Sequence, residues 1–225
     1  MSLIVKICGL KTPEALDVAL ESGADLVGFV FFSPSPRHLA LEAAGALGER
    51  VKGRAGKVAL TVDADDETLG DIVAALKPDM LQLHGRESLE RVAAVRMRFG
   101  LPVMKALPIA ERADLAPISR YAEVADRLIF DARAPQDATR PGGLGKPFDW
   151  TLLKGVDPGI PFMLSGGLDA GNVAGAIAVT RAPGVDVSSG VERAPGEKDV
   201  EKIRAFVRAA RKAEAGLSAA KSVTA

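Results

Sequence analysis

Eight short apolar runs of β type recur along this chain, and stretches of helical periodicity separate them. Near-continuous apolar strands that alternate with amphipathic helices indicate a parallel sheet, because helices cover the faces of such sheets. Eight units of this kind within 225 residues predict an α/β fold with a single closed (β/α)8 barrel, the TIM barrel. The predicted strands are Ile4–Cys8, Leu26–Phe31, Lys57–Val62, Met80–His84, Val103–Leu107, Arg127–Asp131, Pro161–Ser165 and Val185–Ser188.

An open doubly wound sheet is the alternative arrangement of the same elements. Such sheets usually have fewer strands, and their dinucleotide-binding members carry a run of glycines after the first strand. The corner from Cys8 to Thr12 contains one glycine, so this motif is missing. The closed barrel is therefore the favoured arrangement.

One domain accounts for almost the whole chain, because no polar linker divides it. The last apolar stripe of helical period ends at Ala210, and the residues after it are rich in Ala, Ser and Lys without a period. We expect a barrel domain over residues 1–212 and a flexible C-terminal tail over residues 213–225. The longest irregular stretch, residues 132–148, becomes an extended loop after the sixth strand.

Charge and composition exclude several classes of protein. The 29 basic and 29 acidic residues give a formal net charge of zero, which argues against binding to nucleic acid or to a membrane through a basic patch. The sequence shows neither a long apolar span nor a signal peptide, and its single cysteine cannot form an internal disulfide. We therefore expect a cytoplasmic protein that acts on a small molecule.

Polar residues gather where the predicted strands end, which is where barrel enzymes place their active sites. The two histidines, His38 and His84, lack the spacing of metal ligands, so we expect no metal. The remaining candidates are Cys8, Arg37, Gln82, Asp131, Gly166, Gly167, Asp186, Ser188 and Ser189.

Two of these corners suit a phosphate group. Glycine or serine follows the seventh strand at residues 165–167 and the eighth strand at residues 188–190. Glycines let backbone N–H groups approach an anion, and a helix that begins near Asp169 adds a favourable field. Barrels often bind phosphate between the loops after these two strands. A tight turn explains each corner equally well on its own.

The same residues belong to longer strings that resemble the phosphoribosylanthranilate isomerase family of tryptophan biosynthesis. The resemblance runs from residue 3 to about residue 210, in order and with matching spacing. The strings are Lys6–Gly9, Phe29–Phe31, Ser35–Arg37, Gln82–Gly85, Phe130–Ala132, Gly142–Trp150, Leu164–Leu168 and Gly184–Glu192.

The resemblance implies an Amadori-type isomerisation of a phosphosugar, N-(5-phosphoribosyl)anthranilate, without a cofactor or metal. It assigns Asp131 as the general acid that opens the sugar ring and Cys8 as the general base that removes a proton from carbon 2. It also assigns Arg37 to the anthranilate carboxylate. Gln82 and His84 take a supporting part in substrate binding, together with Asp186 and the phosphate corners. The chain is expected to act as a monomer or homodimer.

Cysteine acts as a general base only as a thiolate, and a free thiol has a pKa of about 8.5. A neighbouring positive charge would lower that pKa. Arg37 is a candidate for the cation that lowers the pKa of Cys8. Lys6 shares strand parity with Cys8 and must also point inward, where an ammonium needs a partner. Asp186 occupies the matching place on the eighth strand, so we predict a Lys6–Asp186 contact, either direct or shared through a water molecule.

Two other readings of the strand ends stay open at this point. Another phosphosugar enzyme could share the phosphate corners, although such enzymes need a lysine pair, a metal or another acid and base. A barrel that binds phosphate without catalysis would have no use for Cys8, Asp131 and Arg37 together. The joint presence of these three residues favours the isomerase.

Overall fold

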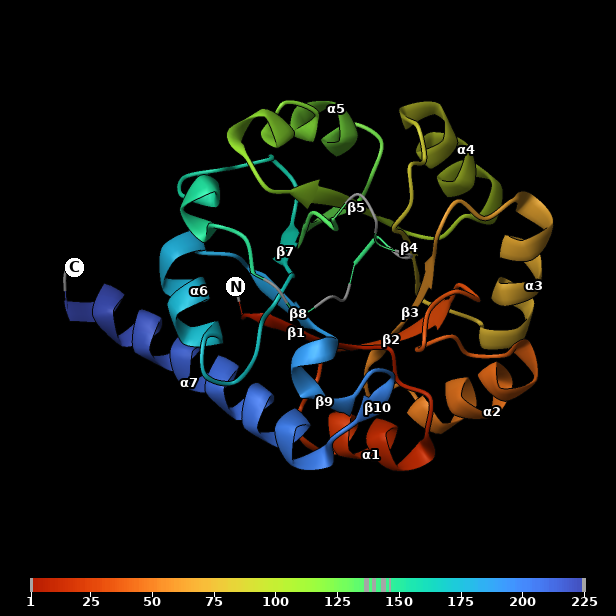
Figure 1. Ribbon diagram of the computed structural model, residues 1–225, viewed down its shortest axis with the longest axis horizontal. Coiled ribbons are helices and arrows are strands. Elements are labelled where there is room, and N and C mark those ends of the chain that lie inside the picture. Colours follow the sequence, from red (N-terminus) through yellow and green to blue (C-terminus); the bar gives the residue numbers. More distant parts are fainter. Residues whose placement is uncertain (1, 136–137, 139–140, 143–144, 146, 224–225) are drawn as a thin grey trace.

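The computed structural model describes residues 2–135, 138, 141–142, 145 and 147–223. Eight parallel strands close into a barrel in chain order, with β1 hydrogen-bonded to β8, and helices form a ring around it (Figure 1). The predicted fold is confirmed. The elements are β1 (Ile4–Cys8), α1 (Pro13–Glu21), β2 (Leu26–Phe31), α2 (Leu41–Val51), β3 (Gly56–Thr61), α3 (Asp66–Leu76), β4 (Met80–Leu83), α4 (Leu89–Phe99), β5 (Val103–Ile109), η1 (Arg112–Leu115), α5 (Ile118–Ala122), β6 (Arg127–Ala132), η2 (Trp150–Leu153), β7 (Phe162–Leu164), α6 (Val173–Thr180), β8 (Gly184–Val187), η3 (Ser189–Val191), β9 (Glu192–Ala194), β10 (Glu197–Lys198) and α7 (Val200–Val223).

Strand alternation decides which side chains face the barrel interior. In β1, Val5 and Ile7 pack into the large core between sheet and helices, whereas Cys8 belongs to a separate cluster inside the barrel with Val30 and Leu60. The side chains of a strand point alternately to its two faces. Lys6 therefore points inward with Cys8.

The interior of the barrel is filled with side chains. Its lower part is an apolar cluster of Met104, Ala106, Ile129 and Met163 from β5, β6 and β7. This filling matches the packed core expected of such a barrel. The polar groups consequently lie above it, at the carboxyl ends of the strands.

The first helix begins with a side-chain cap. Thr12 has an extended backbone, its side chain accepts a hydrogen bond from the backbone N–H of Ala15, and Pro13 follows at the first helical position. Proline suits that position because its missing N–H would have no partner there. The cap fixes the direction in which the chain leaves Cys8.

Helix α6 begins at Val173, later than the predicted start near Asp169. The carboxylate of Asp169 accepts hydrogen bonds from the backbone N–H groups of Gly171 and Asn172. These bonds hold the intervening residues in a turn. Aspartate side chains often form such local bonds to the backbone in place of a helix. The helix start thus lies farther from the seventh strand than expected.

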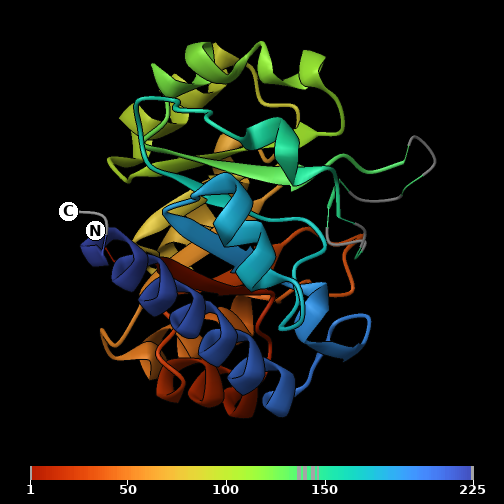
Figure 2. The same ribbon diagram turned by 90° about the vertical axis from the view of Figure 1, so that its left-hand side faces the viewer.

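A short antiparallel hairpin, formed by β9 and β10, follows β8 and has no counterpart among the predicted elements. Figure 2 shows it at the end of the barrel opposite the two chain termini. This is the end at which the strands finish. The hairpin is therefore placed beside the predicted active site.

The C-terminal helix extends past residue 212, after which we expect a flexible tail. Helix α7 continues to Val223, and Glu214 accepts a 2.7 Å hydrogen bond from the backbone N–H of Leu3. Leu217 packs against the core. The start of any flexible segment stays a prediction.

Among the described residues, no helix is long and apolar enough to cross a membrane. Of the glycine-rich string at residues 142–150, positions 143, 144 and 146 lie outside the described part of the chain.

Candidate active site

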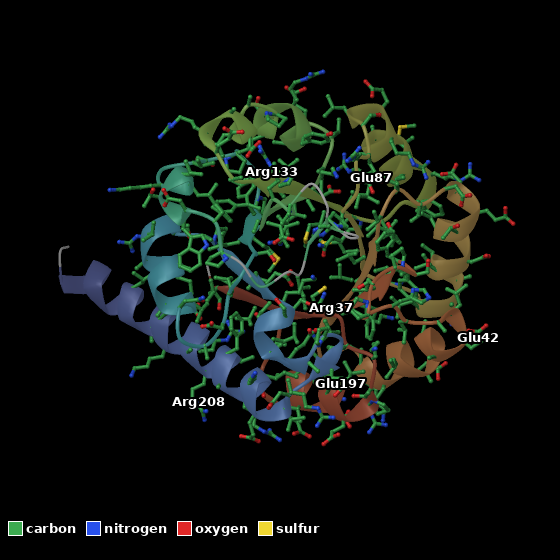
Figure 3. All side chains as sticks on the ribbon, viewed as in Figure 1. Arg37, Glu42, Glu87, Arg133, Glu197 and Arg208 are labelled. Carbon is green, nitrogen blue, oxygen red and sulfur yellow. The ribbon has the colours of Figure 1, made fainter. Side chains whose placement is uncertain are left out.

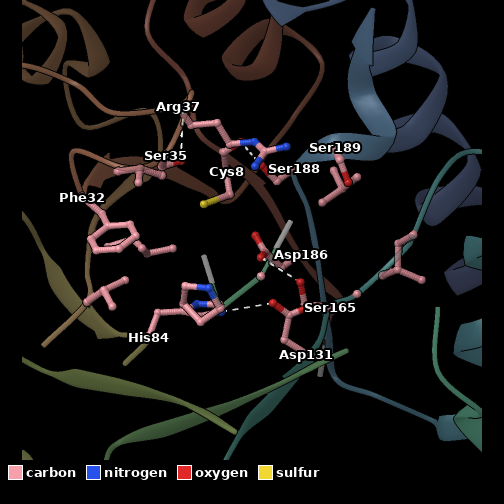
Figure 4. A pocket seen from close by; sticks show the side chains of 18 of the residues that line it. Cys8, Phe32, Ser35, Arg37, His84, Asp131, Ser165, Asp186, Ser188 and Ser189 are labelled. Carbon is pink, nitrogen blue, oxygen red and sulfur yellow. Dashed lines mark hydrogen bonds and ion pairs between the residues drawn. The ribbon is translucent and has the colours of Figure 1, made fainter. Parts of the chain in front are cut away.

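A pocket opens at the carboxyl ends of the barrel strands, with Arg37 near the centre of the barrel (Figure 3) and the side chains of several strands converging on it (Figure 4). The predicted residues that line it are Cys8, Arg37, His84, Asp131, Gly166, Gly167, Asp186, Ser188 and Ser189. Sequence reasoning thus brought nearly all of its candidates to one place. Gln82 is fully buried and lies outside the lining.

Cys8 stands at the end of β1 and is 3% exposed. Its neighbour across the sheet is Gly28, and a methyl group at Gly28 would lie 2.8 Å from the Cys8 sulfur and 3.2 Å from Cε of Lys6. Gly28 therefore leaves the space that both side chains occupy. Burial is the largest influence on the thiol and raises its pKa above the ordinary value.

Lys6 and Asp186 form the predicted contact. The Lys6 ammonium donates a 2.8 Å hydrogen bond to Oδ1 of Asp186, and both side chains are almost completely buried. The other oxygen of Asp186 accepts a 3.2 Å hydrogen bond from the Ser165 hydroxyl. Burial alone would lower the pKa of Lys6, but the charges of Asp186 and Cys8 outweigh it and raise that pKa.

The cations that lower the pKa of Cys8 most are Lys6 and Lys198, and a contribution from Arg37 stays a prediction. Lys6 lowers the pKa of the thiol most, whereas the negative charge of Asp186 raises it. The guanidinium of Arg37 is directed to a carboxylate, as described below. Lys6 therefore has two partners that compete for one charge.

Asp131 lies on the far side of the pocket from Cys8, at the end of β6 (Figure 4). Nε2 of His84 is 3.1 Å from Oδ2 of Asp131, and the side-chain amide of Gln82 is 2.9 Å from Nδ1 of the same ring. If the amide N–H of Gln82 donates to Nδ1, the ring carries its proton on Nε2 and donates to Asp131. This chain of contacts gives Gln82 its place behind His84.

Arg37 is buried in the loop after β2. Its Nε and Nη2 donate to the two carboxylate oxygens of Glu192, at 2.7 and 2.8 Å. Two parallel bonds of this kind fix the plane of a guanidinium. The hydroxyl of Ser35 accepts a 3.2 Å hydrogen bond from the backbone N–H of Arg37, which fixes the backbone as well.

An apolar wall was missed by sequence reasoning. Val30, Phe32, Leu60 and Val62 line the pocket between Cys8 and His84. An apolar surface of this kind suits an aromatic ring. Strand parity was the available signal, because Val30 and Leu60 face inward with Cys8.

The two phosphate corners meet on the other side of the pocket. Gly166 and Gly167 have φ angles of 85° and 67°, and Ser188 and Ser189 lie beside them in the lining. The Ser188 hydroxyl donates a 3.2 Å hydrogen bond to the backbone carbonyl of Cys8. The corner after β8 is thereby linked to the strand that carries the thiol.

Within the described ranges, no three His, Cys, Asp or Glu residues are grouped so that they could hold an ion.

Known proteins resemble this chain over almost its full length. A family model described as N-(5'phosphoribosyl)anthranilate (PRA) isomerase matches residues 5–209. The N-(5'-phosphoribosyl)anthranilate isomerase of Nitrobacter winogradskyi is 66% identical over 222 residues, which is 99% of each chain.

Solved structures agree with the sequence comparisons. The crystal structure of phosphoribosyl anthranilate isomerase from Thermotoga maritima has a TM-score of 0.84 at 34% identity, with 93% of this chain and 99% of that chain covered. A second isomerase structure, in complex with reduced 1-(o-carboxyphenylamino)-1-deoxyribulose 5-phosphate, has a TM-score of 0.80 at 32% identity and the same coverage.

Proposed function

The chain belongs to the N-(5'-phosphoribosyl)anthranilate isomerase family, and we propose that Asp131 and Cys8 carry the two proton transfers of its reaction. The enzyme converts N-(5-phosphoribosyl)anthranilate into 1-(2-carboxyphenylamino)-1-deoxyribulose 5-phosphate in tryptophan biosynthesis. The reaction is internal to the substrate. An aldose-type carbon is reduced as its neighbour is oxidised, and no group is gained or lost.

Asp131 is the general acid. Its proton goes to the ring oxygen of the sugar, the bond from that oxygen to carbon 1 breaks, and the anilino nitrogen lends its electron pair to form a Schiff base. The hydrogen bond from Nε2 of His84 supports this role, because it stabilises the carboxylate that is left behind. Gln82 supports it indirectly by fixing the tautomer of His84.

Cys8 is the general base. Its thiolate removes the proton from carbon 2, and the electron pair of that bond forms an enamine with carbon 1. The positive charge of the Schiff base favours this step, because it draws the electrons of the breaking bond. Keto–enol exchange then gives the ketose.

The pocket has a suitable place for each end of the substrate. The corners with Gly166, Gly167, Ser188 and Ser189 suit the phosphate. Arg37 suits the carboxylate of the anthranilate, and the apolar wall suits its ring. The observation that carries the proposal is the placement of Cys8 and Asp131 on different sides of this one pocket.

Substitution of the two residues tests their roles. Asp131→Asn and Cys8→Ala should each lower kcat by roughly a hundredfold to ten-thousandfold, the usual contribution of a general acid or base. Asp63→Asn is the matched control, since Asp63 follows β3 but lies outside this pocket, and Asn tolerates its φ of 48°. Full activity of either catalytic variant would refute its assignment.

We further propose a cytoplasmic enzyme that works as a monomer or homodimer. Sedimentation of the purified protein distinguishes the two states.

A further inference from the structure

A buried group of three charged side chains lies behind the pocket wall, and the reaction described above does not use two of them. Glu192 at the start of β9 accepts the two bonds from Arg37 described above. It also accepts a 2.8 Å hydrogen bond from the ammonium of Lys198 in β10. All three side chains are at most 5% exposed.

Two basic side chains share one carboxylate, and burial lowers the pKa of Lys198 below its ordinary value. Burial by itself raises the pKa of Glu192, but the bond from Arg37 and the charge of Lys198 outweigh it and hold that pKa below the ordinary value. The carboxylate is therefore ionised at neutral pH.

The hairpin that carries Glu192 and Lys198 is fixed against the loop that carries Arg37. Gly196, in the turn between β9 and β10, has a φ of 81°, and a side chain there would collide with the backbone carbonyl of Pro36. The Gly196 N–H also donates a 3.2 Å hydrogen bond to Glu192. The turn thus packs on the residue that precedes Arg37.

Lys198 extends these contacts to the thiol strand. Its ammonium donates to the carbonyl and the hydroxyl of Ser188, at 2.8 and 3.3 Å. The Ser188 hydroxyl in turn donates to the carbonyl of Cys8. A continuous series of polar contacts therefore joins Arg37, Glu192, Lys198, Ser188 and Cys8.

We propose that Glu192 is a positioning residue, which holds the Arg37 guanidinium in the orientation that binds the substrate's carboxylate. A guanidinium has five N–H donors in one plane, so the bidentate bond to Glu192 decides which edge meets the ligand. Lys198 supports the Glu192 carboxylate through its 2.8 Å hydrogen bond. The inference rests on the proposed contact between Arg37 and the carboxylate.

The test compares two ligands that differ in one group. They are reduced 1-(o-carboxyphenylamino)-1-deoxyribulose 5-phosphate and its counterpart without the ring carboxylate, and calorimetry gives their dissociation constants. Glu192→Gln should weaken binding of the first ligand by roughly tenfold to a hundredfold, the usual range for a charge-assisted contact. Binding of the second ligand should change by less than about threefold, because that ligand does not use the oriented edge.

Glu197→Gln is the matched control on the same hairpin. Glu197 is exposed and pairs with Arg193, and Figure 3 shows it farther from the barrel axis than Arg37. This variant should bind both ligands as the parent protein does. Glu192→Asp is a second, milder variant that keeps the charge but shortens the reach, so it too should weaken the first ligand selectively.

The outcomes separate this proposal from the one on which it rests. Arg37→Lys should also weaken the first ligand selectively, and adding Glu192→Gln to it should cost less than about threefold more. If Arg37→Lys leaves the first ligand unaffected, the carboxylate contact itself is refuted. If Arg37→Lys acts but the Glu192 variants weaken both ligands equally or neither, the positioning role is overturned.

Discussion

Two lysine–carboxylate pairs are buried in this barrel at nearly equal distances, but their surroundings differ. Lys6 and Asp186 are 2.8 Å apart inside the barrel, whereas Lys105 and Glu87 are 2.7 Å apart. Lys105 points outward from β5, because its neighbours Met104 and Ala106 face the interior. Figure 3 shows Glu87 on the side of the barrel near α4.

The outer pair is surrounded by backbone groups. Lys105 also donates to the carbonyls of Leu83 and Gly85, at 3.3 and 2.7 Å. Glu87 accepts hydrogen bonds from the backbone N–H groups of Asp63 and Gly85. Both charged groups thus bind backbone groups, and these bonds connect the loops after β3 and β4. A buried charge with this many partners serves the fold.

The inner pair acts on a titrating group instead. The charge of Lys6 lowers the pKa of Cys8 while that of Asp186 raises it, and Asp186 also lines the pocket. The difference teaches that burial and pairing of a lysine do not reveal its role. The role follows from whether its remaining neighbours are backbone carbonyls or a reactive side chain.

Loss of Lys6 should have the largest effect on catalysis. In Lys6→Met the thiol loses its main stabilising cation, so kcat/KM at neutral pH should fall by roughly tenfold to a thousandfold, which corresponds to a pKa change of about one to three units. The pH profile of kcat/KM is the measurement. Because the pKa of Cys8 is raised by burial, the rate should climb with pH, and in the variant this rise should lie at higher pH.

A purely structural role for Lys6 would look different. The variant would then lose amplitude at every pH without moving the rising part of the profile. Such a result would mean that both lysine–carboxylate pairs serve only the stability of the fold.

Loss of Lys105 should mainly reduce stability. Lys105→Met leaves Glu87 buried without its counter-ion, which costs about 3–5 kcal/mol and lowers Tm by about 6–20 °C in a protein of this size. Activity per folded molecule should fall by less than about tenfold. Calorimetric unfolding and an assay well below Tm check the two statements, and a larger loss of activity than in Lys6→Met would reverse the comparison.

The outer pair should also make the protein sensitive to acid. Burial raises the pKa of Glu87, but Lys105 and the backbone N–H groups outweigh it, so the pKa lies below its ordinary value. The unfolded chain therefore binds a proton more readily than the folded one. The stability from Glu87 is present above its unfolded pKa of about 4.3 and disappears as the pH falls through the folded pKa.

The smallest effect is expected at the edge of the outer pair. The Tyr121 hydroxyl donates a 3.0 Å hydrogen bond to the backbone carbonyl of Glu87, and the Tyr121 ring lies 5.8 Å from the Lys105 ammonium. Tyr121→Phe keeps the ring and loses the hydroxyl, so it should cost about 0.5–1.5 kcal/mol. Denaturant unfolding measures this loss of free energy of unfolding. If Tyr121→Phe cost as much as Lys105→Met, the tyrosine and not the ion pair would be the source of the stability.

The inner pair could be predicted from the sequence, and the outer one could not. Strand alternation has a period of two, so Lys6 and Asp186 were both assigned to the interior of neighbouring strands. Glu87 lies in a loop, where no period fixes the direction of a side chain. Lys105 therefore had no foreseeable partner, although its strand was predicted correctly.

The same limit applies to the pocket. The strand ends brought Cys8, Asp131 and Arg37 together as predicted, because all parallel strands of a barrel finish at one end. The partner of Arg37 was missed because Glu192 lies in a hairpin whose two strands have three and two residues. Such short strands carry no periodic signal. Gln82 was predicted beside the substrate, yet its contact with His84 depends on the rotamer of each side chain.

The single cysteine of the chain allows the state of the pocket to be followed by chemical modification of the native protein. The thiol lines the pocket but is only 3% exposed and its pKa is raised, so a small thiol-specific reagent at alkaline pH is the one to use, and it can add only one mass increment per chain. Protection by a bound ligand then measures occupancy, and the modified fraction counts intact sites in a preparation. Neither a label nor a cysteine-free background has to be engineered for such experiments.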